Sequence, residues 1–161
     1  MKRIVYYIGL LLLLTATVHC SRFAALRQAR LEQHLKERVL SFNDAFGTGN
    51  CRVLLPMLDR FSREYLSAEF RQAFCEPIDE LHGSTFSLQK IIISDDQQAA
   101  IVEFRTEYAV KDLQPHDGIQ RWLRENGDWY VVPQNSDTLR TFIEHFSTSK
   151  NFDPKHPAFR Y

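Results

Sequence analysis

The spacing of apolar residues changes once along this chain, and that change limits the folds open to it. Between Phe23 and Gly83 apolar residues recur at intervals of three and four, as on one face of a helix. Between Thr85 and Val132 they largely alternate with polar residues, as in strands that are buried on one side. Helices followed by a run of strands predict an α+β domain, with the helices packed on one antiparallel sheet.

Stop signals divide the helical half into three expected segments. The first ends at Gly47-Thr48-Gly49-Asn50, because glycine and asparagine terminate helices. A short helix is expected over 51–59, and a longer one over 62–83. Ser62 can cap this longer helix at its start, and Pro77 would kink or divide it.

The strand half contains four expected strands, which turn signals separate. Asn126-Gly127 is the strongest short hairpin signal in the chain. Aligning the apolar faces sets the register of both hairpins. The expected strands are Thr85–Ser94, Ala99–Val110, Ile119–Glu125 and Asp128–Val132. The expected pairs are Leu88–Phe104 and Ile92–Ala100 in the first hairpin, and Trp122–Val131 and Arg124–Trp129 in the second.

A last helix is expected over Thr138–Phe146, with a tail after it. The helix would bury one apolar side, formed by Leu139, Phe142, Ile143 and Phe146. The tail contains Pro154 and Pro157 and has no period, so we expect it to be irregular. The expected organisation is a leader over 1–20, a basic juxtamembrane helix over 21–40, an α+β domain over 41–147 and a tail over 148–161.

The leader is an uncharged run from Ile4 to Val18 behind Lys2 and Arg3. Such a run is typical of an export signal or a membrane anchor, and it predicts a single-pass inner-membrane protein with its domain in the periplasm. Three outcomes are open: an uncleaved anchor that contacts the membrane through residues 4–18, lipidation at Cys20, or cleavage after Cys20 with secretion.

The number of cysteines and the balance of charge limit the kinds of site and partner that the chain can have. Cys51 and Cys75 can form a disulfide in an oxidising compartment, which would close a loop of about 24 residues worth roughly 3 kcal/mol. The alternative is two separately buried thiols. Metal-ligand spacings are absent, so no metal site is expected. Basic and acidic residues number 20 each, which argues against a nucleic-acid partner.

In three segments this order of elements resembles the nuclear transport factor two superfamily, whose cone-shaped fold is shared with ketosteroid isomerase. The matching segments are Phe46 to Asn50, Ser62 to Gly83 and Arg121 to Val132, and the likeness covers about residues 35 to 146. It is greatest to small exported bacterial members of unknown function. The resemblance implies a curved sheet around a conical pocket, and the candidate pocket residues are Tyr65, Asp79, His82, Lys90, Tyr108 and Trp122.

Each candidate also has an ordinary explanation. Asp79 and His82 are one helical turn apart and can form a surface pair. Tyr65 and Tyr108 can be core aromatics, and Lys90 can protect a sheet edge. No phosphate-binding loop, nucleophile elbow or carboxylate-rich metal loop occurs, so neither a cofactor nor a catalytic residue is assigned.

These observations predict a membrane-anchored extracytoplasmic domain that binds a small ligand or a protein and has no catalytic activity. Its expected partners are the membrane and either a second copy or an envelope protein. One alternative is an assembly subunit of an envelope machine, resembling the bitopic type IV secretion components. The other is a pocket enzyme of isomerase or dehydratase type.

Overall fold

The computed structural model of the chain divides into two units, Met1–Lys36 and Glu37–Tyr161. The first unit is helical, and the second contains the sheet. Among the described residues, no helix combines the length and the apolar character that crossing a bilayer requires. The structure describes residues 2–64, 72, 74–76, 78, 82–109, 113–133 and 138–159.

The helical elements follow the stop signals of the sequence. Helix α1 covers Lys2–Gly47, and the chain leaves it through Gly49, whose φ of 68° is one that glycine adopts readily. The backbone N–H of Asn50 then bonds the carbonyl of Ala45 at 2.8 Å and closes the helix end. The short elements that follow are α2 (Cys51–Leu54), the 3-10 turn η1 (Leu55–Met57) and α3 (Arg60–Glu64).

The start of α3 corrects one prediction. Asp59, and not Ser62, caps this helix, because its carboxylate accepts hydrogen bonds from the Ser62 backbone N–H at 3.1 Å and from the Ser62 hydroxyl at 2.6 Å. Helical conformation recurs at residues 72, 74–76 and 78. The remainder of the helix expected over 62–83, including Tyr65 and Asp79, lies outside the described residues.

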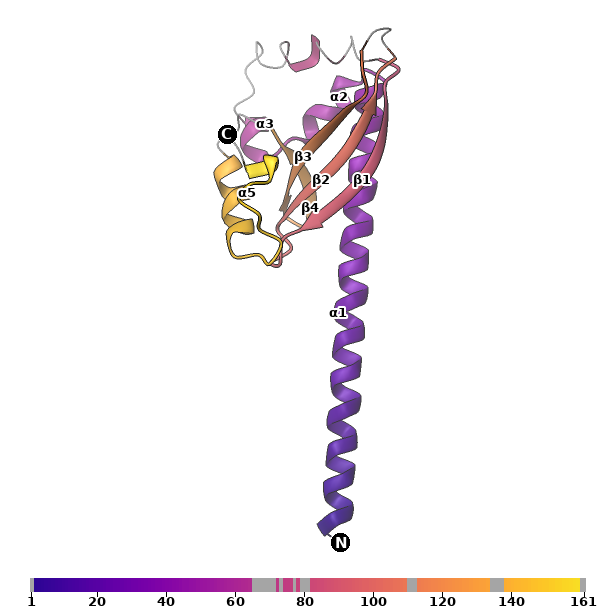
Figure 1. The fold of residues 1–161 in the computed structure, drawn as a ribbon, viewed down its shortest axis with the longest axis vertical. Coiled ribbons are helices and arrows are strands. Elements are labelled where there is room, and N and C mark those ends of the chain that lie inside the picture. The colour runs from indigo at the N-terminus through magenta and orange to yellow at the C-terminus, as the bar shows by residue number, and fades with distance from the viewer. Residues whose placement is uncertain are drawn as a thin grey trace. The chain divides into compact units, whose positions relative to one another are not determined.

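The four expected strands form one antiparallel sheet in sequence order, β1-β2-β3-β4 (Figure 1). The Asn126-Gly127 hairpin has the predicted register, with Trp122 opposite Val131 and Arg124 opposite Trp129. Both turn residues have positive φ, as a two-residue hairpin turn requires. The strands are β1 (Thr85–Ile93), β2 (Ala99–Glu107), β3 (His116–Glu125) and β4 (Asp128–Val132).

The first hairpin differs from the prediction by one residue. Leu88 pairs with Phe104 as expected, but Lys90 pairs with Glu103, so Gln89 is an extra residue in β1. This β-bulge moves Ile92 from Ala100 to Ile101. The alternation of apolar residues does not reveal this bulge. The pattern fits one register before the extra residue and another register after it, and it does not mark where the change occurs.

The sheet is covered on both faces. On one face the Trp122 ring packs edge-on against Phe42 of α1, with ring centroids 5.8 Å apart. On the other face lies α5 (Thr138–Ser147), whose predicted apolar side packs on the sheet. The buried cluster on that face consists of Ala99, Ile101, Leu123, Val132, Leu139, Phe142, Phe146 and Ala158.

The segment over 148–161, which we expected to be an irregular tail outside the domain, contributes to this cluster. Its 3-10 turn η2 (Pro157–Phe159) buries Ala158 completely. The Phe159 ring lies 5.4 Å from Phe146 and 6.0 Å from Phe142, centroid to centroid. The described part of this segment is therefore part of the folded domain.

Candidate functional site

The first half of β3 lies beside a hollow in the described surface. Strand β4 pairs with Arg121–Glu125 only, so it does not cover the residues before Arg121. A cavity of about 440 Å³ lies here, and another of about 240 Å³ adjoins it. The described residues that line both cavities are Phe46, Phe86, Phe104, Ile119 and Arg121.

Three phenylalanine rings form the apolar wall of this site. Phe86 of β1 lies 5.6 Å from Phe46 of α1 and 5.8 Å from Phe104 of β2, between ring centroids. Gly118 makes room for the Phe104 ring, since a Cβ atom on Gly118 would lie within 2.7 Å of the ring carbon Cε2. The wall is therefore preformed by packing contacts between α1 and two strands.

Arg121 is a buried cation on β3, and alternation along the strand places its side chain on the sheet face opposite Phe104. It is only 7% exposed, and its Nε donates to the carbonyl of Ala158 at 2.6 Å. Its Nη2 donates to the carbonyl of Pro157 at 3.3 Å. Burial lowers the pKa of this guanidinium, because the charged form loses hydration. Within the described part of the chain, no carboxylate forms an ion pair with Arg121.

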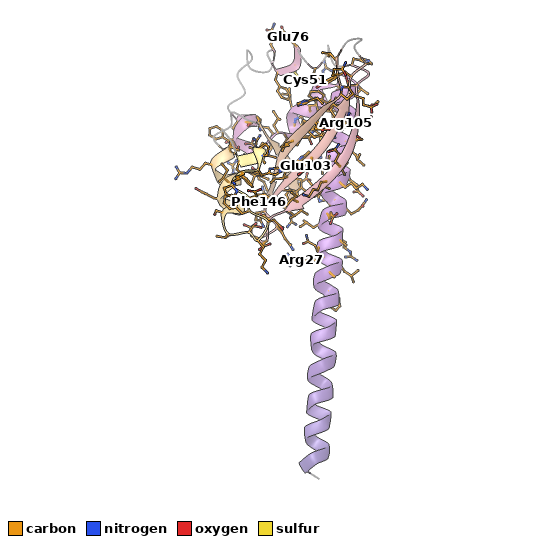
Figure 2. The ribbon with its side chains drawn as sticks, in the orientation of Figure 1. Arg27, Cys51, Glu76, Glu103, Arg105 and Phe146 are labelled. Carbon is orange, nitrogen blue, oxygen red and sulfur yellow. A yellow bond between two sulfur atoms is a disulfide. The ribbon has the colours of Figure 1, made fainter. Side chains whose placement is uncertain are left out.

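The carboxylate on the described rim of the larger cavity is already paired. Asp117 is exposed and bonds Nη1 of Arg105 at 3.2 Å, and it also accepts a hydrogen bond from Gln89 at 3.3 Å. His116, Thr106 and the half-buried Tyr108 complete the described rim. Arg105 and Glu103 are labelled on β2 in Figure 2.

Of the sequence-predicted pocket residues, the structure places Tyr108 in this site and Trp122 outside it. Trp122 is fully buried, and its Nε1 donates to the side-chain carbonyl of Gln120 at 3.2 Å. Trp122 is therefore a core residue, because its ring and its donor are both occupied within the domain.

Lys90 and His82 are also separate from this cavity. The bulge at Gln89 turns Lys90 to the sheet face opposite Leu88, where its amine lies 4.0 Å from the Glu103 carboxylate and is largely exposed. His82 lines a different groove, of about 520 Å³, beside Asp44 and Ser84. Tyr65 and Asp79 lie outside the described residues. The four candidates in the described part of the chain are thus not brought together.

Sequence reasoning missed Arg121 as a site residue. Its signal is weak: an arginine within the strand segment Ile119-Gln120-Arg121-Trp122-Leu123, next to the core residue Trp122. The same arginine would have been exposed if 148–161 were a solvated tail. Its burial depends on the carbonyls of η2, which no local pattern predicts.

The structure describes the side chains of two of the three cysteines. Cys51 and Cys75 are joined in a disulfide, with Cα atoms 5.6 Å apart, and Cys51 is labelled in Figure 2. The side chain of Cys20 lies outside the described part of the structure. Among the described residues, no group of three histidine, cysteine, aspartate or glutamate side chains could hold a metal ion.

A helical half followed by one four-stranded antiparallel sheet, with an aromatic cavity on it, defines an α+β domain of cone type. The order of helices and strands is the one that the resemblance predicted, and the fold is similar to that of solved structures. The solved structure of a SEC-C motif containing protein from Psychrobacter arcticus is similar, with a TM-score of 0.50 and 14% identity. The match covers 63% of this chain and 59% of that one.

Two further solved structures have slightly lower scores. An NTF2-like protein of unknown function from Shewanella baltica matches with a TM-score of 0.48 and 14% identity, over 64% of this chain and 89% of that one. A protein of unknown function with a cystatin-like fold, from Nostoc punctiforme, matches with a TM-score of 0.48 and 15% identity. That match covers 63% of this chain and 86% of that one. No family model and no curated protein matches the chain. At these identities the likeness concerns the fold alone.

Proposed function

We propose that this chain is a non-catalytic binding domain on the outer side of the inner membrane. It takes a small apolar ligand into the cavity beside β3. The observation that carries this proposal is the preformed wall of Phe46, Phe86 and Phe104 around a cavity of about 440 Å³. Small-molecule sites have volumes of roughly 300–1,000 Å³ and mostly apolar linings with a few polar groups.

The described polar groups favour binding over acid–base chemistry. A pocket enzyme of the isomerase type needs a carboxylate or imidazole that is desolvated in the cavity. Asp117, the carboxylate in the described lining, is exposed and bonded to Arg105. His116 is exposed as well. The isomerase or dehydratase alternative therefore has less support than binding.

Two features support the proposed compartment. The uncharged run over residues 4–18 follows Lys2 and Arg3, as in an export signal or anchor. The Cys51–Cys75 disulfide is of the kind that persists in oxidising compartments. Anchoring through the leader, lipidation at Cys20 and cleavage after Cys20 all give the same outer location, and the intact mass of the purified protein distinguishes them.

The binding test uses the full chain in lipid nanodiscs and a neutral probe, 2-naphthamide, with titration calorimetry against empty nanodiscs. Phe104→Ala removes one wall ring and should weaken binding at least about tenfold, as truncation of a buried aromatic contact does. Leu113→Ala is the control, because Leu113 is exposed and outside the described lining. Equal affinities in the two variants would contradict the proposed site.

A location test completes the experiment. Alkaline phosphatase fused to the carboxyl terminus should be active in cells, because that enzyme matures only outside the cytoplasm. Activity of a cytoplasmic reporter alone would refute the outer location. Crosslinking of the native membrane fraction would then show a second copy or an envelope protein as partner, and a large envelope complex would favour the assembly-subunit alternative.

A further inference from the structure

Strand β4 leaves part of one edge of β3 uncovered. The ladder between the two strands ends at the pair of Arg121 and Val132. Before Arg121, β3 pairs with β2 along its other edge. The residues over 116–119 are exposed or half-buried. An uncovered strand edge carries backbone groups with which another extended chain can pair.

The hydrogen bonds of the sheet show which backbone groups this edge presents. The N–H of Arg124 bonds the Gln98 carbonyl at 2.8 Å, so it points to the β2 side. Successive residues of a strand direct their N–H and C=O groups to opposite edges, and the register of β3 on β2 is unbroken. Asp117 and Ile119 therefore direct both groups away from β2. No described residue bonds these groups.

The cavity of about 440 Å³ lies along this edge. Its described lining includes every residue over 116–119, although their side chains alternate between the two sheet faces. Phe104 is directly opposite Gly118 and shares its face. Because Gly118 has no side chain, the Phe104 ring lies over it, with Cε2 2.7 Å from the place of a Cβ atom. A strand added at the edge would therefore place its side chain opposite Gly118 against the phenylalanine wall.

We propose that β3 binds an extended peptide of a partner protein along residues 116–120, antiparallel to β3 as β4 is, with one apolar side chain of the peptide in the cavity. This inference rests on the proposed function, because that side chain occupies the same cavity as the small ligand. The outward N–H and C=O groups of Asp117 and Ile119 carry partial charges at a fixed spacing, and an extended backbone presents the complementary ones. The peptide continues the ladder that β4 forms on the same edge.

A second copy of this chain fits the edge less well than such a peptide. Pairing of two β3 edges about a two-fold axis at Gly118 would put glycine opposite glycine, and no side chain would enter the cavity. An axis at Asp117 would put two like charges opposite each other. An axis at Ile119 would put Asp117 opposite Arg121, whose edge β4 already pairs. A peptide with an apolar central residue satisfies both the backbone groups and the cavity.

The test uses the full chain in lipid nanodiscs and the probe peptide Ser-Thr-Leu-Thr-Ser, with fluorescein at its amino end and an amide at its carboxyl end. Fluorescence anisotropy measures the affinity. The leucine is the cavity residue, and the threonines beside it direct their N–H groups to β3. Methylating the first threonine nitrogen removes one hydrogen bond and should weaken binding at least about tenfold. Methylating the leucine nitrogen is the matched control, because that N–H points away from β3, and should change the affinity less than about twofold.

Two further changes test the two parts of the site separately. Alanine in place of the leucine of the probe should weaken binding about tenfold or more, because less apolar surface enters the cavity. In the chain, Ile119→Pro removes an outward N–H but no hydrogen bond to β2, and should weaken binding at least about tenfold. Leu113→Pro is its control and should leave the affinity unchanged, because Leu113 is exposed and precedes β3.

A parallel titration with 2-naphthamide separates this inference from the proposed function. Binding of 2-naphthamide without binding of the probe overturns the peptide inference and leaves an apolar site. Failure of both to bind refutes the two proposals together. Equal weakening by the two methylations also overturns the inference, because the backbone of the probe then does not pair with β3.

Sedimentation of the full chain in detergent tests the other occupant of the edge. We expect a monomer. A dimer that the probe dissociates would show that a second copy occupies the edge, and would overturn the inference. If Ile119→Pro does not fold, the peptide series on the unmodified chain still decides the matter.

Discussion

The side-chain amide of Gln120 donates a hydrogen bond of 2.7 Å to Oδ1 of Asn43, and both residues are buried between α1 and β3. The carbonyl of the same amide accepts the Nε1–H of Trp122 at 3.2 Å. This chain of hydrogen bonds joins the end of α1 to the sheet beside the Phe42–Trp122 contact. Burial of these polar groups costs desolvation free energy, and the hydrogen bonds offset that cost only while every group has its partner.

Asn43→Ala should therefore destabilise the domain by about 1–3 kcal/mol, because it leaves the Gln120 amide buried without an acceptor. Urea unfolding measures the free energy change. The control is Gln72→Ala, which removes an exposed amide that bonds Glu76 and should cost less than about 0.5 kcal/mol. Equal losses in the two variants would show that the buried hydrogen bond adds nothing.

The disulfide should contribute roughly 3 kcal/mol, since it closes a loop with a sequence separation of 24. Cys51→Ser and Cys75→Ser should each lower the unfolding midpoint by a similar amount. Adding a reductant to the unmodified chain should give the same shift and no shift in either variant. A non-reducing peptide map that shows both thiols free would contradict the pairing.

Much of the fold could be predicted from the sequence, because its signals are local. The change of period gave the order of helices and strands, and Asn126-Gly127 gave the second hairpin with its register. The bulge at Gln89 and the buried hydrogen bond between Gln120 and Asn43 could not be predicted. Both depend on partners far along the chain, and neither leaves a periodic signal.

The candidate site was harder to predict than the fold. Of the six candidates only Tyr108 lines the main cavity in the described structure, whereas Arg121 was not considered. Its role depends on η2 docking on the sheet, and the two prolines near η2 indicated an irregular tail. Irregular backbone can still be well packed when aromatic side chains such as Phe152 and Phe159 anchor it, with ring centroids 5.0 Å apart.

Docking of the last segment makes a direct prediction about Phe159. Phe159→Ala should destabilise the domain by about 2–4 kcal/mol, because its ring packs against Phe142, Phe146 and Phe152. It should also loosen η2 and raise the hydrogen-exchange rate at Phe159, whose N–H bonds the His156 carbonyl at 3.0 Å. Unchanged stability would mean that the segment is not docked in solution.

The contact between Asp96 and His145 predicts a pH dependence. Partial burial raises the pKa of Asp96, whereas hydrogen bonds from Ser94, the Gln98 N–H and His145 lower it. The hydrogen bonds together outweigh the burial, so the pKa of Asp96 is below the ordinary value of about 3.9. A lowered carboxyl pKa stabilises the fold above the unfolded pKa. This contribution is lost as pH falls through the folded value.

Asp96→Asn should therefore flatten the loss of stability below about pH 4 and cost up to about 1 kcal/mol at pH 7. The cost is small because the carboxylate is 42% exposed and screened by solvent. Urea unfolding at a series of pH values measures the effect. Parallel pH profiles of the variant and the unmodified chain would show that Asp96 has the same pKa in both states.

Gly118 offers the sharpest test of the cavity wall. A Cβ atom at this position would meet the Phe104 ring at distances that real Cβ atoms almost never show, including 2.7 Å to Cε2. Gly118→Ala must therefore displace the ring, at a cost of about 1–3 kcal/mol, and should weaken 2-naphthamide binding by changing the wall. Because both effects act through one ring, Phe104→Leu and Gly118→Ala should be non-additive in a double-mutant cycle, with the smaller ring relieving the clash. Additive losses would show that the two residues are not in contact, and that the wall of the proposed site is built differently.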